Sequence, residues 1–83
     1  MIMRIYSVYD LKAEVYQMPF YAHNRGHAMR MIQDVVRNKD SMLAKHPGDF
    51  RLLEVGEYND SNGRIVGFEI NKEVVDIIDL FED

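Results

Sequence analysis

His23 and His27 come closest to a metal-binding pair in this 83-residue chain, because histidines four positions apart can share one face of a helix. Between them lie Asn24, a favourable helix N-cap, and Gly26, so we expect His23 to precede the helix that carries His27. No carboxylate stands close enough in the sequence to add a third ligand. The pair therefore does not predict a metal site, and we expect no cofactor.

The other titratable side chains lack the arrangements that catalysis uses. Asp10 and Glu14 flank a short connection, where we expect water-exposed turn carboxylates rather than an acid/base pair. His46 stands before Pro47 and is expected in a loop. The sequence holds no cysteine, no nucleophile beside an activating base and no glycine-rich phosphate loop. We therefore expect a protein that is not an enzyme.

Basic side chains offer a different chemistry, the neutralisation of phosphate. The net charge is −4, yet residues 23–51 hold six basic residues against three acidic ones, and residues 52–83 hold nine acidic residues against two basic ones. Such asymmetry is typical of a phosphate-facing element beside an acidic tail, although two solvated faces would give the same charge pattern. Ordinary core and sheet-interface residues would likewise account for the Tyr and Phe side chains. The candidate nucleic-acid-binding residues are Arg25, Arg30 and Arg37, with Tyr6 and Tyr21 as rings that stack on unpaired bases.

Arg25, Arg30 and Arg37 lie within the strongest helical pattern of the chain, which follows a predicted hairpin. Residues 3–9 and 14–22 are rich in Ile, Val, Tyr and Phe, so they predict two antiparallel strands. Pro19 cannot donate to a sheet ladder, which places the second strand at an edge or puts a bulge near the proline. After the Asn24 cap, the helix shows one apolar stripe, made of Ala28, Met31, Ile32, Val35 and Val36.

The second half of the chain predicts another hairpin. Residues 37–49 form a polar connection with a one-turn helix capped by Asp40 or Ser41. Residues 50–58 and 64–70 have strand-type composition, and the polar residues between them give a strong turn signal.

The end of the chain leaves two structures open. Residues 71–83 mix acidic and apolar side chains. They form either a short helix N-capped by Asn71 or a tail that orders on contact with a partner. In the helix, the docked residues would be Val74, Ile77, Ile78 and Phe81.

The predicted fold class is α+β, with a four-stranded antiparallel sheet in the order ββαββ and one helix packed on one face. We expect a single domain over residues 1–70, followed by an acidic amphipathic segment at 71–83, because a chain this short buries only about 60% of its unfolded surface. No apolar run approaches the roughly 20 residues that a membrane span needs. The absence of cysteine and of a signal-peptide pattern predicts a reducing cytosol.

One helix cannot cover both faces of such a sheet. Neither face of the first strand is plainly polar, so we expect an apolar surface to remain exposed on the second face. A homodimer that forms through the sheet would cover this surface. The expected interface residues are Tyr6, Val8, Tyr16 or Phe20.

Several short motifs occur in a recognisable order over roughly residues 4–68. They are SVYD at 7–10, KAE at 12–14, the pair Pro19 and Phe20, a helix opening with Gly26 and Ala28-Met29-Arg30, HPGDF at 46–50, and LLEVGEY at 52–58. In this order the chain resembles the small non-structural DNA-binding protein of gokushoviruses, which are single-stranded DNA phages of the Microviridae. The acidic end of the chain lies beyond the resemblance.

The resemblance implies a non-enzymatic accessory protein that turns phage replication toward single-stranded genomes for packaging, in the cytoplasm of the host bacterium. It brings no residue-level active site. The expected partner is DNA, single-stranded and bound with modest affinity, since the chain as a whole is acidic. The alternative is a protein interaction module, an adaptor that binds a replication or host protein through its sheet face or its C-terminal segment.

Overall fold

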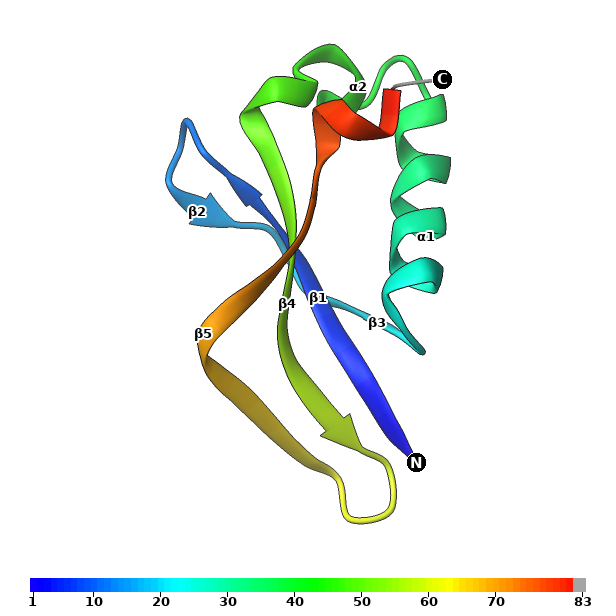
Figure 1. Ribbon diagram of the computed structural model, residues 1–83, viewed down its shortest axis with the longest axis vertical. Coiled ribbons are helices and arrows are strands. Elements are labelled where there is room, and N and C mark those ends of the chain that lie inside the picture. The colour runs from blue at the N-terminus through cyan, green and yellow to red at the C-terminus, as the bar shows by residue number, and fades with distance from the viewer. Residues whose placement is uncertain (82–83) are drawn as a thin grey trace.

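The protein is built on one strongly twisted antiparallel sheet, with its main helix lying along part of one face (Figure 1). The computed structural model describes residues 1–81. The elements are β1 (Ile2–Asp10), β2 (Val15–Tyr16), β3 (Phe20–Ala22), α1 (Arg25–Arg37), α2 (Met42–Lys45), the 3-10 turn η1 (Pro47–Asp49), β4 (Phe50–Asn59), β5 (Arg64–Asp76) and the 3-10 turn η2 (Ile77–Phe81). The α+β class with an antiparallel sheet and one main helix is confirmed.

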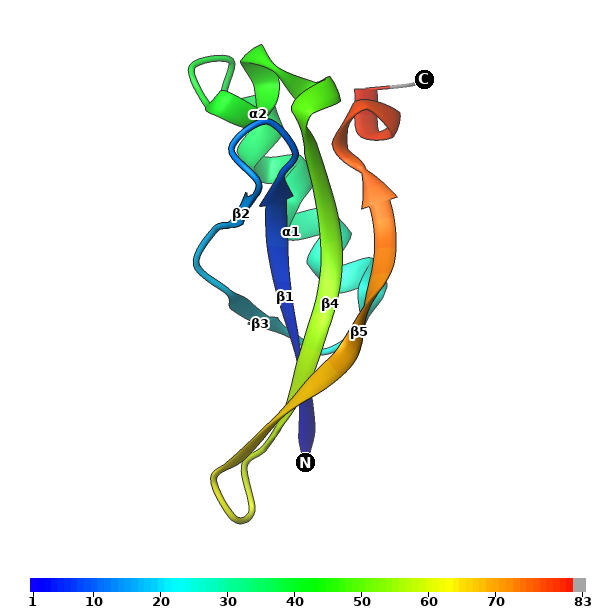
Figure 2. The ribbon, with the colours of Figure 1, turned by 90° about the vertical axis from the view of Figure 1, so that its left-hand side faces the viewer.

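Strands β1 and β4 form the centre of the sheet, and β5 lies along the free side of β4 (Figure 2). Both β2 and β3 pair with the opposite side of β1, so together they take the place of the single strand predicted over residues 14–22. The break between them contains Pro19, because proline has no N–H to give to the ladder. The edge position expected for this proline is confirmed.

Helix α1 begins at the predicted cap. The Asn24 side chain accepts a hydrogen bond from the backbone N–H of His27 at 2.9 Å. The predicted apolar stripe included Val35, which is 43% exposed. The buried strip of the helix surface is therefore narrower than the apolar stripe in the sequence. The fully buried helix residues are Ala28, Ile32 and Val36.

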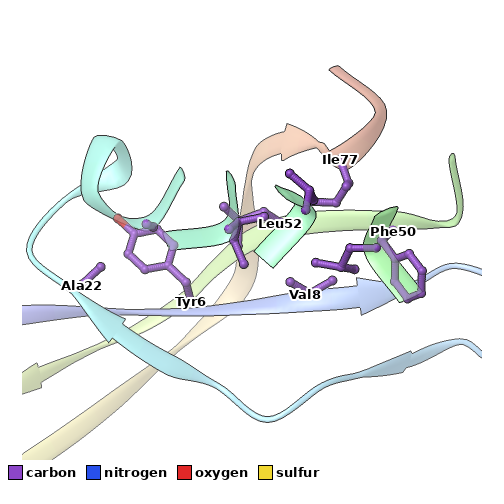
Figure 3. Close-up of a cluster of buried hydrophobic side chains, with 10 residues drawn as sticks. Tyr6, Val8, Ala22, Phe50, Leu52 and Ile77 are labelled. Carbon is purple, nitrogen blue, oxygen red and sulfur yellow. The ribbon is translucent and has the colours of Figure 1, made fainter. Parts of the chain in front are cut away.

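The core lies between α1 and the sheet (Figure 3). Tyr6 and Val8 of β1 point toward the helix, together with Phe50 and Leu52 of β4. Val8 pairs with Leu52 in the ladder, and directly opposed residues project to the same face of a sheet. We call the helix-covered side the inner face and the opposite side the outer face.

The connection between α1 and β4 contains the predicted one-turn helix. Ser41, one of the two predicted caps, accepts a hydrogen bond from the Ala44 N–H at 3.2 Å, and Leu43 packs into the core. Among residues 1–81, no helix has the length and apolarity that crossing a membrane requires.

The C-terminal segment differs from both structures that the sequence left open. Residues 71–76 continue β5, so the helix N-capped by Asn71 is wrong, and a free tail is wrong for the described part of the segment. The cause is long-range pairing, since the Arg51 side chain in β4 donates to Asp76 at 2.6 Å and to Glu73 at 2.7 Å. Ile77 follows at 0% exposure in the core. Residues 82 and 83 lie outside the described part of the chain.

The outer face is partly covered by curling of the sheet. Ile5, Ser7 and Leu53 are all less than 10% exposed although α1 lies on the other side. The curl brings the two edges of the sheet together. The Asn71 amide of β5 donates a hydrogen bond to the Tyr16 hydroxyl of β2 at 2.9 Å. The apolar second face is therefore smaller than the sequence indicates.

Of the four residues expected at a dimer interface, two are buried in the core and Tyr16 is accessible on the surface. Tyr6 and Val8 are 1% and 4% exposed, so the placement of these two residues at an interface is wrong, because both belong to the core beneath α1. Phe20 is half-buried against Tyr6, with ring centroids 6.0 Å apart. Tyr16 is 42% exposed and stays accessible on the outer face.

Candidate nucleic-acid interface

Three basic side chains from three separate elements meet beside the start of α1. Arg4 comes from β1, Arg25 from the first position of the helix and Lys72 from β5, and they line a depression of about 290 Å³. The pairing register of the sheet explains this placement, since Tyr6 of β1 pairs with Glu54 of β4, and Glu54 pairs with Lys72 of β5. These three paired residues therefore form a row on the inner face, where the helix begins.

A buried carboxylate, that of Glu54, lines this depression and forms an ion pair with Arg4. Glu54 is 4% exposed, and Arg4 Nη1 lies 3.3 Å from its Oε2 and 2.8 Å from Glu57 Oε1. A buried carboxylate requires such a partner, because desolvation of an unpaired charge is costly. Burial and, to a smaller extent, the charge of Glu54 raise the pKa of the neighbouring Tyr6. Arg25 and Lys72 form no ion pair within residues 1–81.

A second depression adjoins the first around Asn24. It measures about 400 Å³ and is lined by Asn24, Gly26, His27 and Arg30. The first turn of α1 carries no acidic residue, so its free N–H groups and partial positive charge are not offset there. We call the joint area of the two depressions the helix-start surface. Its basic residues are Arg4, Arg25, Arg30 and Lys72.

His27, which lines this surface, and His23 before the helix support the local backbone. His27 Nδ1 accepts a hydrogen bond from the backbone N–H of His23 at 3.2 Å, and the two rings stack with centroids 5.3 Å apart. In the part of the chain that the structure describes, no group of three metal-ligating side chains is found. The pair therefore holds the turn that leads into α1.

Strand β5 extends the helix-start surface beyond the end of the helix. In Figure 1 the hairpin of β4 and β5 continues past the start of α1, where the helix no longer covers it. The Lys72 ammonium lies 4.6 Å from the centroid of the Phe68 ring, so both side chains project from the same side of β5. Val66, which pairs with Glu57, and Arg64 lie on this same side by alternation.

In a comparison with protein-family models, residues 3–80 match the family described as Phage ORF5 protein. The chain belongs to this family. The phage origin expected from the sequence is therefore confirmed. No curated protein and no solved structure is similar enough to count as a match.

In this member of the Phage ORF5 family, the three candidate arginines do not form one cluster. Arg25 and Arg30 both flank the start of α1. Arg37 stands at the other end of the helix, roughly 18 Å along the axis from Arg25 at 1.5 Å per residue. Its Nη1 also lies 3.0 Å from the Asp34 carboxylate, so part of its charge is already offset. The structure brings together two of the three.

The two candidate tyrosines are placed apart from the helix-start surface. Tyr6 is buried, so its ring cannot reach a base while the core is intact. Tyr21 is 47% exposed and pairs with Ile5 in the ladder, which puts it on the outer face, and its ring lies 5.6 Å from that of Tyr58. Phe68, in contrast, is half-buried, and its ring centroid lies 4.6 Å from the Lys72 ammonium.

Sequence reasoning missed Arg4, Lys72 and Phe68 as site residues. A signal was present, because Arg64, Val66, Phe68, Ile70 and Lys72 alternate with other residues and such a pattern places them on one side of a strand. The predicted strand ended at residue 70 and so separated Lys72 from it. The contact between β5 and the start of α1 depends on the twist of the sheet, which no local pattern shows.

Proposed function

We propose that the protein is a non-enzymatic accessory protein of phage single-stranded DNA replication or packaging, and that it binds DNA through the helix-start surface in the cytoplasm of the host bacterium. The observation that carries the proposal is the convergence of basic side chains from β1, α1 and β5 around the start of one helix. Phosphate fits this place because uncompensated cations and free helix N–H groups both attract anions. The resemblance to the gokushovirus protein and the membership in a phage family support the same role.

The charge balance predicts modest affinity. The chain carries −4 overall, and Arg4 is engaged with two glutamates, so Arg25, Arg30 and Lys72 supply most of the attraction. If three or four phosphates are contacted, the slope of log K against log salt concentration for a single strand is roughly −2 to −3. Binding of this kind is measurable at low salt and weak at high salt.

Fluorescence anisotropy with a labelled single-stranded oligonucleotide tests the proposal. The double variant Arg25→Gln with Lys72→Gln removes two site charges, and Lys39→Gln with Lys45→Gln removes the same charge from exposed positions after α1. We expect the site variant to bind more weakly and to flatten the salt slope by roughly 1.4, while the control keeps most of both. Equal losses in the two variants, or binding without salt dependence, would contradict the assignment.

The adaptor alternative receives less support from the C-terminal segment. Val74, Val75 and Leu80 pack against the core around the buried Ile77, so the described part of the segment is structural. Removal of residues 72–83 is therefore expected to lower thermal stability rather than to abolish only the binding of a partner. A homodimer stays part of the proposal, and Tyr16 is the accessible residue among those expected at its interface.

A further inference from the structure

We infer that Phe68 and the side of β5 around it bind an unpaired base of single-stranded nucleic acid. This inference rests on the proposed function and adds the chemical feature that separates single strands from duplex. Phosphate contacts alone would not favour a single strand, because a duplex presents the higher density of backbone charge. A base needs an accessible ring close to the cations, and Phe68 provides it.

The placement of Phe68 fits a base-stacking residue better than a core residue. The ring is half-buried, so it is held in position while part of its surface stays accessible. Phe68 is absent from the core cluster and from the residues packed against it, and neighbouring Val66 is 59% exposed. Val66 and Phe68 belong to the hairpin of β4 and β5, and in Figure 1 this hairpin extends past the start of α1.

Charge complementarity identifies the class of ligand. The side of β5 that carries Val66 and Phe68 has Arg64 at one end and Lys72 at the other, and Lys72 also borders the depression that contains Arg25. On this side of the sheet the Glu57 carboxylate is already engaged by Arg4 at 2.8 Å. The exposed acids next to Phe68 and Lys72 in the sequence, Glu69 and Glu73, alternate with them and project from the other side of β5. A polyanion with flat apolar rings matches an apolar strip between cations, and a single-stranded nucleic acid is such a molecule. A duplex keeps its rings stacked inside and would use only the cations.

Lys72 links the two kinds of contact. In the free protein its ammonium lies over the Phe68 ring, 4.6 Å from the centroid, in a cation–π contact that is weak at an exposed position. A base that stacks on the ring displaces the ammonium, which then has a phosphate of the same strand within reach. The lysine exchanges one partner for another, so binding does not leave a charge unpaired.

The test compares two aromatic residues on two probes. The probes are a thymidine oligonucleotide and an abasic oligonucleotide of equal length, which keeps the phosphates and lacks the bases. Phe68→Ala is compared with Tyr21→Ala, whose ring is 47% exposed on the outer face, and thermal unfolding checks that both variants are folded. We expect Phe68→Ala to weaken thymidine binding by about 5- to 150-fold, the range for one stacked base, and to leave abasic binding unchanged. Tyr21→Ala should change neither.

Three results would overturn the inference while leaving DNA binding in place. They are an equal loss on both probes for Phe68→Ala, no loss on either probe, or a thymidine-specific loss for Tyr21→Ala instead. If Phe68→Ala does not fold, Phe68→Leu replaces it, and retention of full thymidine affinity by that variant counts against stacking. Failure of the unaltered protein to bind either probe at low salt would defeat the proposed function itself.

Discussion

Substitution of Gly56 by alanine is predicted to break the close contact that positions the outer hairpin. Gly56 of β4 pairs with Gly67 of β5, next to the bulge at which β4 changes register. A methyl group at Gly56 would lie 2.4 Å from the Val66 carbonyl oxygen and 3.2 Å from the Gly67 Cα. Carbon and oxygen atoms approach no closer than about 3.3 Å even in favourable contacts, so the strands must separate locally by roughly 1 Å.

The size of the effect follows from the neighbours being backbone. Overpacking costs about 1–3 kcal/mol, and we expect the upper end because neither Val66 nor Gly67 can move its backbone without breaking the ladder. For a domain of this size, about 3 kcal/mol lowers the melting temperature by roughly 12 to 24 °C. The hairpin also carries Phe68 and Lys72, so binding of single-stranded DNA should weaken together with stability.

Gly67→Ala is the matched control, since no atom lies within 4 Å of the position its methyl group would take. Thermal unfolding followed by circular dichroism measures both variants. We expect Gly67→Ala to stay within about 1 kcal/mol of the unaltered protein. Equal melting temperatures for the two alanine variants would refute the close approach of β4 and β5.

Three further predictions concern the core. Ile77→Ala should lower the free energy of unfolding by about 2–5 kcal/mol, and Ile78→Ala, at a position 47% exposed, by clearly less; similar values in urea titrations would contradict docking of η2. Tyr6→Glu should unfold the chain rather than produce a folded monomer, as near-ultraviolet circular dichroism would show; a folded variant would place Tyr6 outside the core. The pKa of Tyr6 is raised in the folded state, so the contribution of its neutral hydroxyl to stability is complete below pH 10 and is lost as pH rises through the folded pKa. The Tyr6→Phe variant lacks this titration, so its free energy of unfolding should fall less over that pH range. Parallel pH profiles for the variant and the unaltered protein would contradict this.

Elements fixed by local signals could be predicted from the sequence. Asn24 and the apolar spacing that follows determine where α1 begins and which side packs, and both are properties of neighbouring residues. The turn between β4 and β5 is local in the same way, since Gly63 adopts φ +73° as the polar turn sequence requires. Pro19 interrupts the edge strand for an equally local reason.

The faces of the sheet could not be predicted, because the sheet curls. Ile5 and Tyr6 are neighbours on opposite sides of β1, and both are buried, one by the curled sheet and the other by α1. An alternating pattern identifies the core only when the other side is exposed to water. The sequence of β1 therefore gave no means of choosing Tyr6 for the core.

The end of the chain and the site depend on contacts between distant residues. Residues 71–76 have apolar spacing compatible with a helix, and the ion pairs of Glu73 and Asp76 with Arg51, more than 20 positions away, favour the strand. Only this longer strand brings Lys72 to the start of α1. All three predicted arginines lie on α1, but only Arg25 and Arg30 line the depressions at its start, because Arg37 stands at its other end.

NMR of ¹⁵N-labelled protein, titrated with a thymidine oligonucleotide at low salt, would map the bound strand on the protein. We predict the largest amide shift changes at residues 24–30, at Arg4 and at residues 66–72, which together form the helix-start surface and its extension along β5. Largest changes around Tyr9, Tyr16 and Tyr21 on the outer face, or no changes at all, would contradict it.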